Sequence, residues 1–253
     1  MIGETLTRPV PDAGRSSLSS VALSAIAVAG LAAAPGMARA TVTYDFEAWI
    51  QTNGERGFTN AAPFQLTAGP AGNQLTLTAT AFESPGDRPS HVYMDGSFNG
   101  FIGGMGVCSV LTTGSQCTPS NDDNVSVDGG NEEKLVWEFS QNIDRIALTL
   151  RDSEHYLFNG LDTPGGPSDP DSGQFEFMYG ASAWQVATTD AYGMYTLLLD
   201  GSSNLLKFRP VAAGLENQFY IAMAEVAPIP LPPAVWLLLS GLAGLGAMGR
   251  RRA

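Results

Sequence analysis

The sequence predicts an all-β fold, an antiparallel β-sandwich of jelly-roll type, between two specialised ends. Three observations predict it. Apolar and polar residues alternate with a period of two through much of residues 41–227, as in half-buried strands. Turn pairs such as Asn53-Gly54, Asn99-Gly100 and Asp200-Gly201 separate these runs. The same segment has no convincing amphipathic helix of ten or more residues.

The expected strands follow one another along this segment. In residues 73–82 (NQLTLTATAF) apolar residues alternate with threonine, and in residues 134–140 Leu135, Trp137 and Phe139 share one face. Residues 145–151, 173–180 and 218–226 alternate in the same way. Further strands are expected at residues 42–50, 182–189, 195–200 and 205–210, with LDGSSNLL (199–206) as a hairpin.

The charge of the central segment is strongly negative. The chain of 253 residues has 13 Lys and Arg against 25 Asp and Glu, a formal net charge of -12. Six of the basic and two of the acidic residues lie outside residues 41–227, which leaves 7 basic and 23 acidic side chains, net -16, inside. Such a surface repels nucleic acid and anionic membranes and attracts cations. We therefore expect no nucleic-acid partner; solubility alone also explains this charge.

The N-terminal 40 residues have the three parts of a signal peptide. Arg8 and Arg15 precede a short apolar run at residues 21–34. Ala38 and Ala40 then supply small residues at the -3 and -1 positions of a cleavage site before Thr41. An uncleaved anchor helix is the alternative, but this run is shorter than the roughly 20 residues that span a bilayer.

The C-terminal 26 residues, PIPLPPAVWLLLSGLAGLGAMGRRRA, combine prolines, an apolar run and a basic end. Residues 234–249 carry no charge, and Pro233 is suited to begin a helix. Counted from Ile229, the segment has about the 20 residues that a membrane-spanning helix needs. Arg250, Arg251 and Arg252 favour the cytoplasmic side, which places the central segment outside.

This order of proline motif, apolar helix and arginine cluster resembles the PEP-CTERM sorting signal, and in particular its VPLPA-CTERM variant. Pro230, Leu231 and Pro232 match the Pro-Leu-Pro of the motif, and Ala234 and Trp236 open a segment similar to its helix. Two departures are Ile229 in place of valine and the inserted Pro233.

The resemblance implies an exosortase substrate of a Gram-negative bacterium, cleaved near residues 230–234 after export by way of signal peptidase. It implies a precursor tethered to the inner membrane that then moves to the cell surface or the extracellular matrix, in association with exopolysaccharide. A permanent C-terminal membrane anchor is the alternative.

The two cysteines, Cys108 and Cys117, lie nine residues apart in a Gly/Ser/Thr-rich stretch. In an exported chain they predict a disulfide within one loop. Residues 104–155 around them resemble a block of secreted PEP-CTERM proteins, in which a Gly-x-Gly-Val loop leads to Asp, Asn and Glu residues, a strand pair and an Asp-x-Asp/Glu-His ending, here Asp152 to His155. The resemblance implies an extracellular β-sandwich and carries no activity.

Oxygen-bearing side chains cluster after the second cysteine. Asp122 and Asp123 lie in the run NDDN, and Asp128 and Glu132 follow. Calcium takes about six to eight oxygen ligands, and a loop pinned by a disulfide loses less entropy when it forms a site. These four residues are therefore candidate ligands of a structural calcium, the one cofactor that the sequence suggests. A solvated acidic loop is the alternative.

Catalytic patterns are absent from the sequence. His155 follows Asp152 and Glu154, so a His–carboxylate pair could form there, but no nucleophile motif such as G-x-S-x-G and no H-E-x-x-H accompanies it. We expect a non-enzymatic protein with no catalytic residue. Trp49, Trp137 and Trp184 are candidates for a sugar-stacking platform, although the pattern around Trp137 favours the core.

The leading hypothesis is a non-enzymatic, exported surface or matrix protein. The alternatives are a carbohydrate-binding β-sandwich with a structural calcium and an extracellular hydrolase. A hydrolase would need a cleft with closely paired carboxylates or a His155 oriented by a carboxylate.

Overall fold

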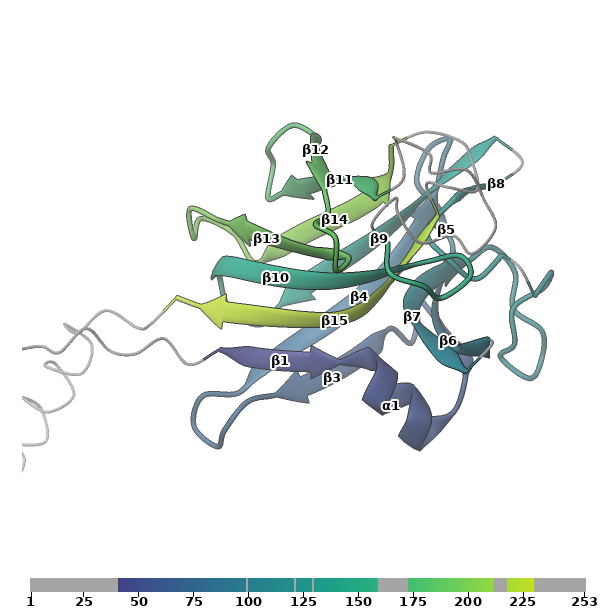
Figure 1. The fold of residues 1–253 in the computed structure, drawn as a ribbon, viewed down its shortest axis with the longest axis horizontal. Coiled ribbons are helices and arrows are strands. Elements are labelled where there is room, and N and C mark those ends of the chain that lie inside the picture. Colours follow the sequence, from purple (N-terminus) through teal and green to yellow (C-terminus); the bar gives the residue numbers. More distant parts are fainter. Residues whose placement is uncertain are drawn as a thin grey trace, which may run out of the picture. The chain divides into compact units, whose positions relative to one another are not determined.

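The computed structural model describes residues 41–98, 100–120, 122–128, 130–158, 173–211 and 218–229. These residues form fifteen strands and one short helix, and every strand pair is antiparallel. The strands make two sheets, which Figure 1 shows as two layers, with β10 and β15 in one and β4, β9 and β14 in the other. The prediction of an all-β fold is confirmed.

One sheet has seven strands. Its order is β13 (Met194–Leu198), β10 (Ile143–Asp152), β15 (Phe219–Pro228), β7 (Phe101–Cys108), β6 (His91–Phe98) and β2 (Arg56–Thr59), with β1 (Val42–Asp45) also paired to β15. Strand β15 is therefore internal, with β10 along one edge and β1 and β7 sharing the other.

The other sheet has eight strands. Its order is β12 (Gln185–Thr188), β11 (Gln174–Tyr179), β14 (Leu205–Pro210), β9 (Asn131–Phe139), β4 (Leu75–Glu83) and β3 (Phe64–Ala68). The short strands β5 (Arg88–Pro89) and β8 (Val127–Asp128) pair with β4 and β9. In β4 and β9 alternate residues are buried, as the period-two pattern predicts.

The core lies between the two sheets and is rich in aromatic rings. Trp137 of β9 is fully buried, with its ring edge-on to Phe208 of β14 at a centroid distance of 5.0 Å. Across the interface, Trp137 Nε1 donates to Met105 Sδ of β7 at 3.2 Å. The prediction that Trp137 belongs to the core is therefore confirmed.

Side chains on the seven-stranded sheet alternate between this core and an outer face. Met94 in β6 and Ile221 in β15 belong to the core. Their neighbours Asp95 and Tyr220 therefore point to the opposite side, because successive side chains of a strand face opposite ways. On β7, between these strands, the outer face is lined by Gly106. Polar residues and glycines thus lie together on the outer face of the seven-stranded sheet.

The expected strand at residues 42–50 is wrong in its second half. The chain forms β1 and then turns into helix α1 (Phe46–Asn53). Asp45 caps this helix, accepting a hydrogen bond from Ala48 N at 2.8 Å, and Gly54 ends it with a φ of 79°. An Asp at the N-cap and a Gly after the last residue are local helix signals, which outweighed the apolar run here.

The hairpin expected at residues 199–206 is also wrong. Strands β13 and β14 flank it, but β13 pairs with β10 in one sheet and β14 with β9 and β11 in the other. The loop crosses between the layers and is held by Tyr179, whose hydroxyl oxygen lies 2.9 Å from Ile143 O and 2.7 Å from Ser203 O. A turn pair between two apolar strands does not specify which strands pair.

Both ends of the chain lie outside the described residues. The signal-peptide expectation concerns residues 1–40, with Ala38 and Ala40, and the sorting-signal expectation concerns residues 230–253. The described residues contain no helix long and apolar enough to cross a membrane.

We expect Trp137→Ala to lower the free energy of unfolding by about 3–5 kcal/mol, because it removes the largest buried side chain and leaves a cavity between the sheets. Trp184→Ala is the matched control, since Trp184 is only partly buried under the guanidinium of Arg209 and should cost about 1 kcal/mol or less. Denaturant unfolding of both variants measures the difference. Equal losses would show that Trp137 is not the centre of the core.

Candidate ligand-binding pocket

A cavity of about 710 Å³ opens on the outer face of the seven-stranded sheet. Its floor consists of buried side chains that come from four separate parts of the chain: Asp95 of β6, Asp123 and Asn124, His155 after β10, and Tyr220 of β15. The exposed residues Glu55 and Glu154 also line it and lie at its mouth. Residues far apart in sequence therefore meet in one polar pocket.

One wall is the segment that follows β7, residues 109–120 and 122–126, called here the pinned segment. A disulfide joins Cys108, at the end of β7, to Cys117 within the segment, so the predicted disulfide is confirmed. Cys108, Cys117 and Tyr93 form a small apolar cluster separate from the main core. The pinned segment is thus fastened to the back of the sheet by a covalent bond and by apolar packing.

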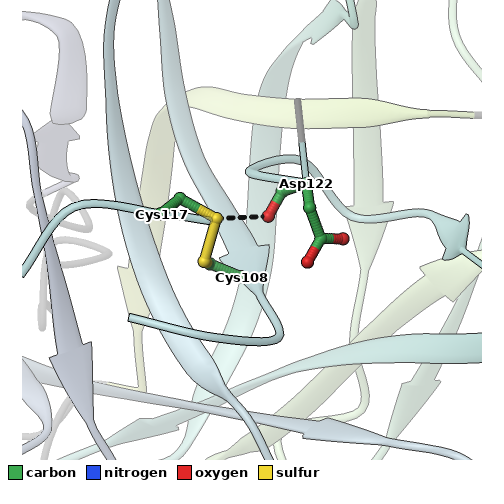
Figure 2. Close-up of side chains that lie close together, drawn as sticks. All are labelled: Cys108, Cys117 and Asp122. Carbon is green, nitrogen blue, oxygen red and sulfur yellow. Dashed lines mark hydrogen bonds between the residues drawn. A yellow bond between two sulfur atoms is a disulfide. The ribbon is translucent and has the colours of Figure 1, made fainter. Parts of the chain in front are cut away.

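Figure 2 shows how Asp122 meets this disulfide. Its main-chain oxygen lies 2.6 Å from Cys117 Sγ, and its carboxyl group is turned away from the sulfur atoms. A disulfide sulfur carries no proton, so this is a close S···O contact rather than a donated hydrogen bond. On the other side, Asp122 Oδ2 accepts a hydrogen bond from Ser109 N at 3.1 Å.

Glycines on β7 let the pinned segment approach the sheet. A Cβ added to Gly106 would lie 2.1 Å from Asp123 O, and one added to Gly104 would lie 2.5 Å from Ile221 O. Gly103 is equally crowded, since its Cβ would lie 2.5 Å from Asp95 Oδ2. No L side chain fits at these distances without movement of main-chain atoms or of buried groups. The packing of the pocket therefore requires the glycines of GGMG, residues 103–106 of β7.

His155 and Asp95 form a buried pair on the floor. The Nε2 atom of His155 lies 2.5 Å from Asp95 Oδ2, and its Nδ1 atom lies 3.0 Å from Phe101 O. Burial by itself would lower the pKa of His155. The hydrogen bonds to Asp95 and Phe101 and the nearby negative charges outweigh burial, and the net effect is a raised pKa. With an acceptor at each ring nitrogen, the imidazolium form satisfies both contacts.

The partner of His155 was not predicted from the sequence. The sequence allowed a pair between His155 and the nearby Asp152 or Glu154, but Asp152 instead accepts hydrogen bonds from the main-chain N–H groups of Glu154 and Tyr156. That turn places His155 at a φ of 68°, a left-handed conformation that is costly for a residue with a side chain. The strained turn directs the ring toward Asp95.

Asp123 is the second buried carboxyl group on the floor. Its Oδ1 atom accepts a hydrogen bond from the hydroxyl of Tyr220 at 2.5 Å. Burial, and then the charge of Asp95, raise the pKa of Asp123 to about 7, although the bond from Tyr220 acts in the opposite direction. Burial also raises the pKa of Tyr220, which stays protonated as the donor.

Two further buried polar groups have an oxygen without a hydrogen-bond partner among the described residues. Asn124 is 3% exposed, and its Nδ2 atom donates to Gln218 Oε1 at 3.2 Å, whereas its Oδ1 atom has no partner. Glu133 is fully buried, and only its Oε2 atom accepts hydrogen bonds, both from Ser126. Buried oxygens of this kind are costly unless something binds them.

The structure brings together only part of the predicted calcium ligands. Asp122 and Asp123 both line the pocket, but they face different partners. Glu132 is not brought to this group, because its carboxylate binds Arg209 at 3.1 Å and lies 3.7 Å from Lys134 Nζ. The side chain of Asp128 lies outside the described part of the chain.

Among the described residues, one set of three ligand-type side chains has its atoms within 4.8 Å of one another, namely Cys108, Cys117 and Asp122. The thiolate is the form of cysteine that binds metals, and both of these cysteines are oxidised to the disulfide. This set therefore does not make a metal centre.

Trp49, Trp137 and Trp184, the tryptophans of the described residues, do not line the pocket. Trp49 packs edge-on against Phe58 and Phe64, at centroid distances of 5.8 Å and 5.2 Å, and Trp184 is covered by the guanidinium of Arg209 at 4.2 Å. With Trp137 in the core, the three rings do not form one sugar-stacking surface.

Comparison with known proteins adds no family to this description. No protein-family model matches the sequence, and no curated protein is significantly similar to it.

We expect Gly106→Ala to destabilise the protein by about 1–3 kcal/mol and to open the pocket, because the new methyl group would collide with the main chain at Asp123. Gly114→Ala is the matched control, since the nearest atom to its added Cβ lies 3.8 Å away. Thermal unfolding together with proteolysis of the pinned segment measures both effects. If the two variants behave alike, the close approach at Gly106 is not required.

The two buried titrating groups of the floor predict that stability falls as the pH rises. A carboxyl group whose pKa is raised from 3.8 to about 7 stabilises the folded state at low pH, and this contribution is lost as the pH rises through that range. A histidine whose pKa is raised contributes below its ordinary value of 6.5 and loses this contribution as the pH rises above it. We therefore expect the free energy of unfolding to decrease from about pH 5 to pH 8.

Asp123→Asn removes the titration of this carboxyl group without removing the acceptor for Tyr220. Its free energy of unfolding should depend less steeply on pH than that of the unsubstituted protein over the same range. Denaturant unfolding at several pH values provides the test. Identical pH dependence in both proteins would mean that Asp123 ionises normally.

Proposed function

We propose that the chain is an exported, non-enzymatic β-sandwich protein of the cell surface or extracellular matrix that binds a small polar ligand in the pocket of the seven-stranded sheet. The observation that carries this proposal is the cavity itself. Its volume of about 710 Å³ lies within the range of ligand sites, and buried polar groups converge on its floor.

The state of His155 supports a binding role over catalysis. A histidine that acts as general base needs one ring nitrogen free to face the reacting group. Both nitrogens of His155 are engaged, one by Asp95 and the other by the main-chain oxygen of Phe101. Its role is to position Asp95 in the floor.

The export and sorting part of the proposal rests on the two ends of the sequence. A signal peptide that ends at Ala40 and the tail with Pro230, Pro232 and Arg250 to Arg252 support export, exosortase processing and delivery to the surface or matrix. Signal peptidase and exosortase are then processing partners, and exopolysaccharide is the partner that the family resemblance suggests. The disulfide agrees with an oxidising compartment.

The jelly-roll assignment belongs to the same proposal. From β9 onward the chain changes sheet at β10, β11, β13, β14 and β15. Strands that alternate between two packed sheets are typical of jelly-roll sandwiches.

We expect the intact mass of protein recovered from its native host to correspond to a chain that begins at Thr41 and ends within residues 230–234. The measurement is mass spectrometry of the membrane fraction and of the culture medium. A mature chain that keeps Arg250 to Ala253 would make the tail a permanent anchor and would contradict sorting, while leaving the pocket untouched.

A polysaccharide hydrolase is the second candidate, and one observation favours it. A buried carboxyl group with a pKa of about 7, as in Asp123, is suited to donate a proton near neutral pH, and other carboxylates line the same pocket. A reducing-end assay on polysaccharide from the host, with Asp123→Asn as the inactive variant, tests it. Release of reducing ends that is lost in this variant would replace the non-enzymatic proposal.

A further inference from the structure

The pocket is lined by many negative charges and by few positive ones. Five carboxyl groups line it, from Glu55, Asp95, Asp122, Asp123 and Glu154, and no lysine or arginine is among the described residues of its lining. The one group there that gains a positive charge, His155, is paired with Asp95. The pocket therefore repels anions and favours a ligand with a positive charge.

The hydrogen-bond donors of the buried floor are already in use. The hydroxyl of Tyr220 donates to Asp123, Asn124 Nδ2 donates to Gln218 Oε1, and both ring nitrogens of His155 face acceptors. A carboxylate has about four acceptor sites, so Asp95 and Asp123 keep spare acceptor capacity. The floor thus offers acceptors, and a ligand that binds there supplies donors.

Asn124 provides an independent sign of a ligand. Asn124 is only 3% exposed. Its side-chain amide donates to Gln218, which also lines the pocket, and so the amide lies at the pocket. The Oδ1 atom of this amide lacks a partner among the described residues. An open buried acceptor is costly, and a donor from a ligand would offset that cost.

Size and geometry argue against a bare metal ion. The cavity of about 710 Å³ is many times the volume of one cation with its water. The carboxyl groups of the floor do not form a set of three with ligand atoms within 4.8 Å of one another in the described part of the chain. Their spacing suits an organic molecule that reaches several acceptors at once.

We propose that the pocket binds an organic ligand through a primary ammonium group, which donates to Asp123 and to Asn124 Oδ1. An ammonium group has three donors and no acceptor, and so complements a floor of this kind. This inference rests on the proposed binding function and names its ligand class. Two sources share the chemistry: an amino sugar with a free amine and an aliphatic polyamine.

Isothermal titration calorimetry of the full mature protein tests the inference. The probes are glucosamine, glucose, N-acetylglucosamine, 1,4-diaminobutane and calcium chloride. We expect at least one of the two amines to bind, and glucose and N-acetylglucosamine to bind at least about tenfold more weakly than that amine or not at all. Binding of glucosamine alone identifies a sugar source, and binding of diaminobutane alone identifies a polyamine.

Two variants locate the site. Asp123→Asn should weaken amine binding about tenfold, because it removes the charge that faces the ammonium group. Glu138→Gln is the matched control, since it removes one negative charge from an exposed position in β9 of the other sheet and should leave affinity unchanged. Asn124→Ala should also weaken binding, and thermal unfolding of each variant verifies that it is folded.

The outcomes separate the inference from the proposed function. If glucose and N-acetylglucosamine bind as tightly as glucosamine, the pocket binds ligands but the ammonium inference is wrong. If calcium binds and the amines do not, the inference is also wrong and the site is a metal site. If folded Asp123→Asn binds amines with unchanged affinity, the amine site lies elsewhere on the protein and the inference is wrong. If none of the probes binds, both the inference and the proposed pocket function are contradicted.

Discussion

The architecture of the pocket depends on one steric constraint, the contact between the pinned segment and the glycines of β7. A main-chain oxygen at Asp123 occupies the space that a side chain at Gly106 would need. Because the glycines of β7 place no side chain on this face, the segment can reach β15. There Val125 and Phe219 exchange main-chain hydrogen bonds of 2.8 Å and 3.2 Å. The disulfide at Cys108 then fixes where the segment starts. Asp123 and Asn124 are carried onto the floor as a consequence of this packing rather than by any attraction between them and the other acids.

The energetics of the floor follow from that placement. Burying several acids on one face of a sheet is unfavourable, and the protein offsets the cost in different ways at each group. Asp95 is balanced by the imidazole of His155, and Asp123 by a tyrosine hydroxyl and by partial protonation. Each of these partners contacts one oxygen of its carboxyl group. The result is a floor that is internally stable yet still able to accept hydrogen bonds from outside.

The sequence predicted the layers of this fold better than their connections. Period-two patterns located the central strands because β4 and β9 each bury one face, and the disulfide followed from two cysteines nine residues apart. Helix α1 was missed because its N-cap signal, Asp45, is a single residue within the run 42–50 that was predicted as a strand, and its second signal, Gly54, lies beyond that run. Part of the site could be predicted from the sequence. Asp122, Asp123 and His155 were recognised as candidate residues, whereas Asp95 and Tyr220 are brought to the pocket only by the pairing of strands that are distant in sequence. The glycines of GGMG were expected to lie in a loop, but the structure places them in strand β7, where glycines mark a close approach of other main chain.

The position of β15 also bears on the order in which the fold can form. This is the last strand of the described chain, yet it lies inside its sheet, and Val42 at the other end of the domain pairs with Val226. Until residues 219–228 have been synthesised, β10, β1 and β7 each lack their neighbour, and Tyr220 is missing from the floor. Contacts of such long sequence separation make folding slow, and open strand edges are prone to pair with other chains. Completion of the sheet therefore comes late, and until β15 is in place the sheet is divided in two, with open edges at β10, β1 and β7.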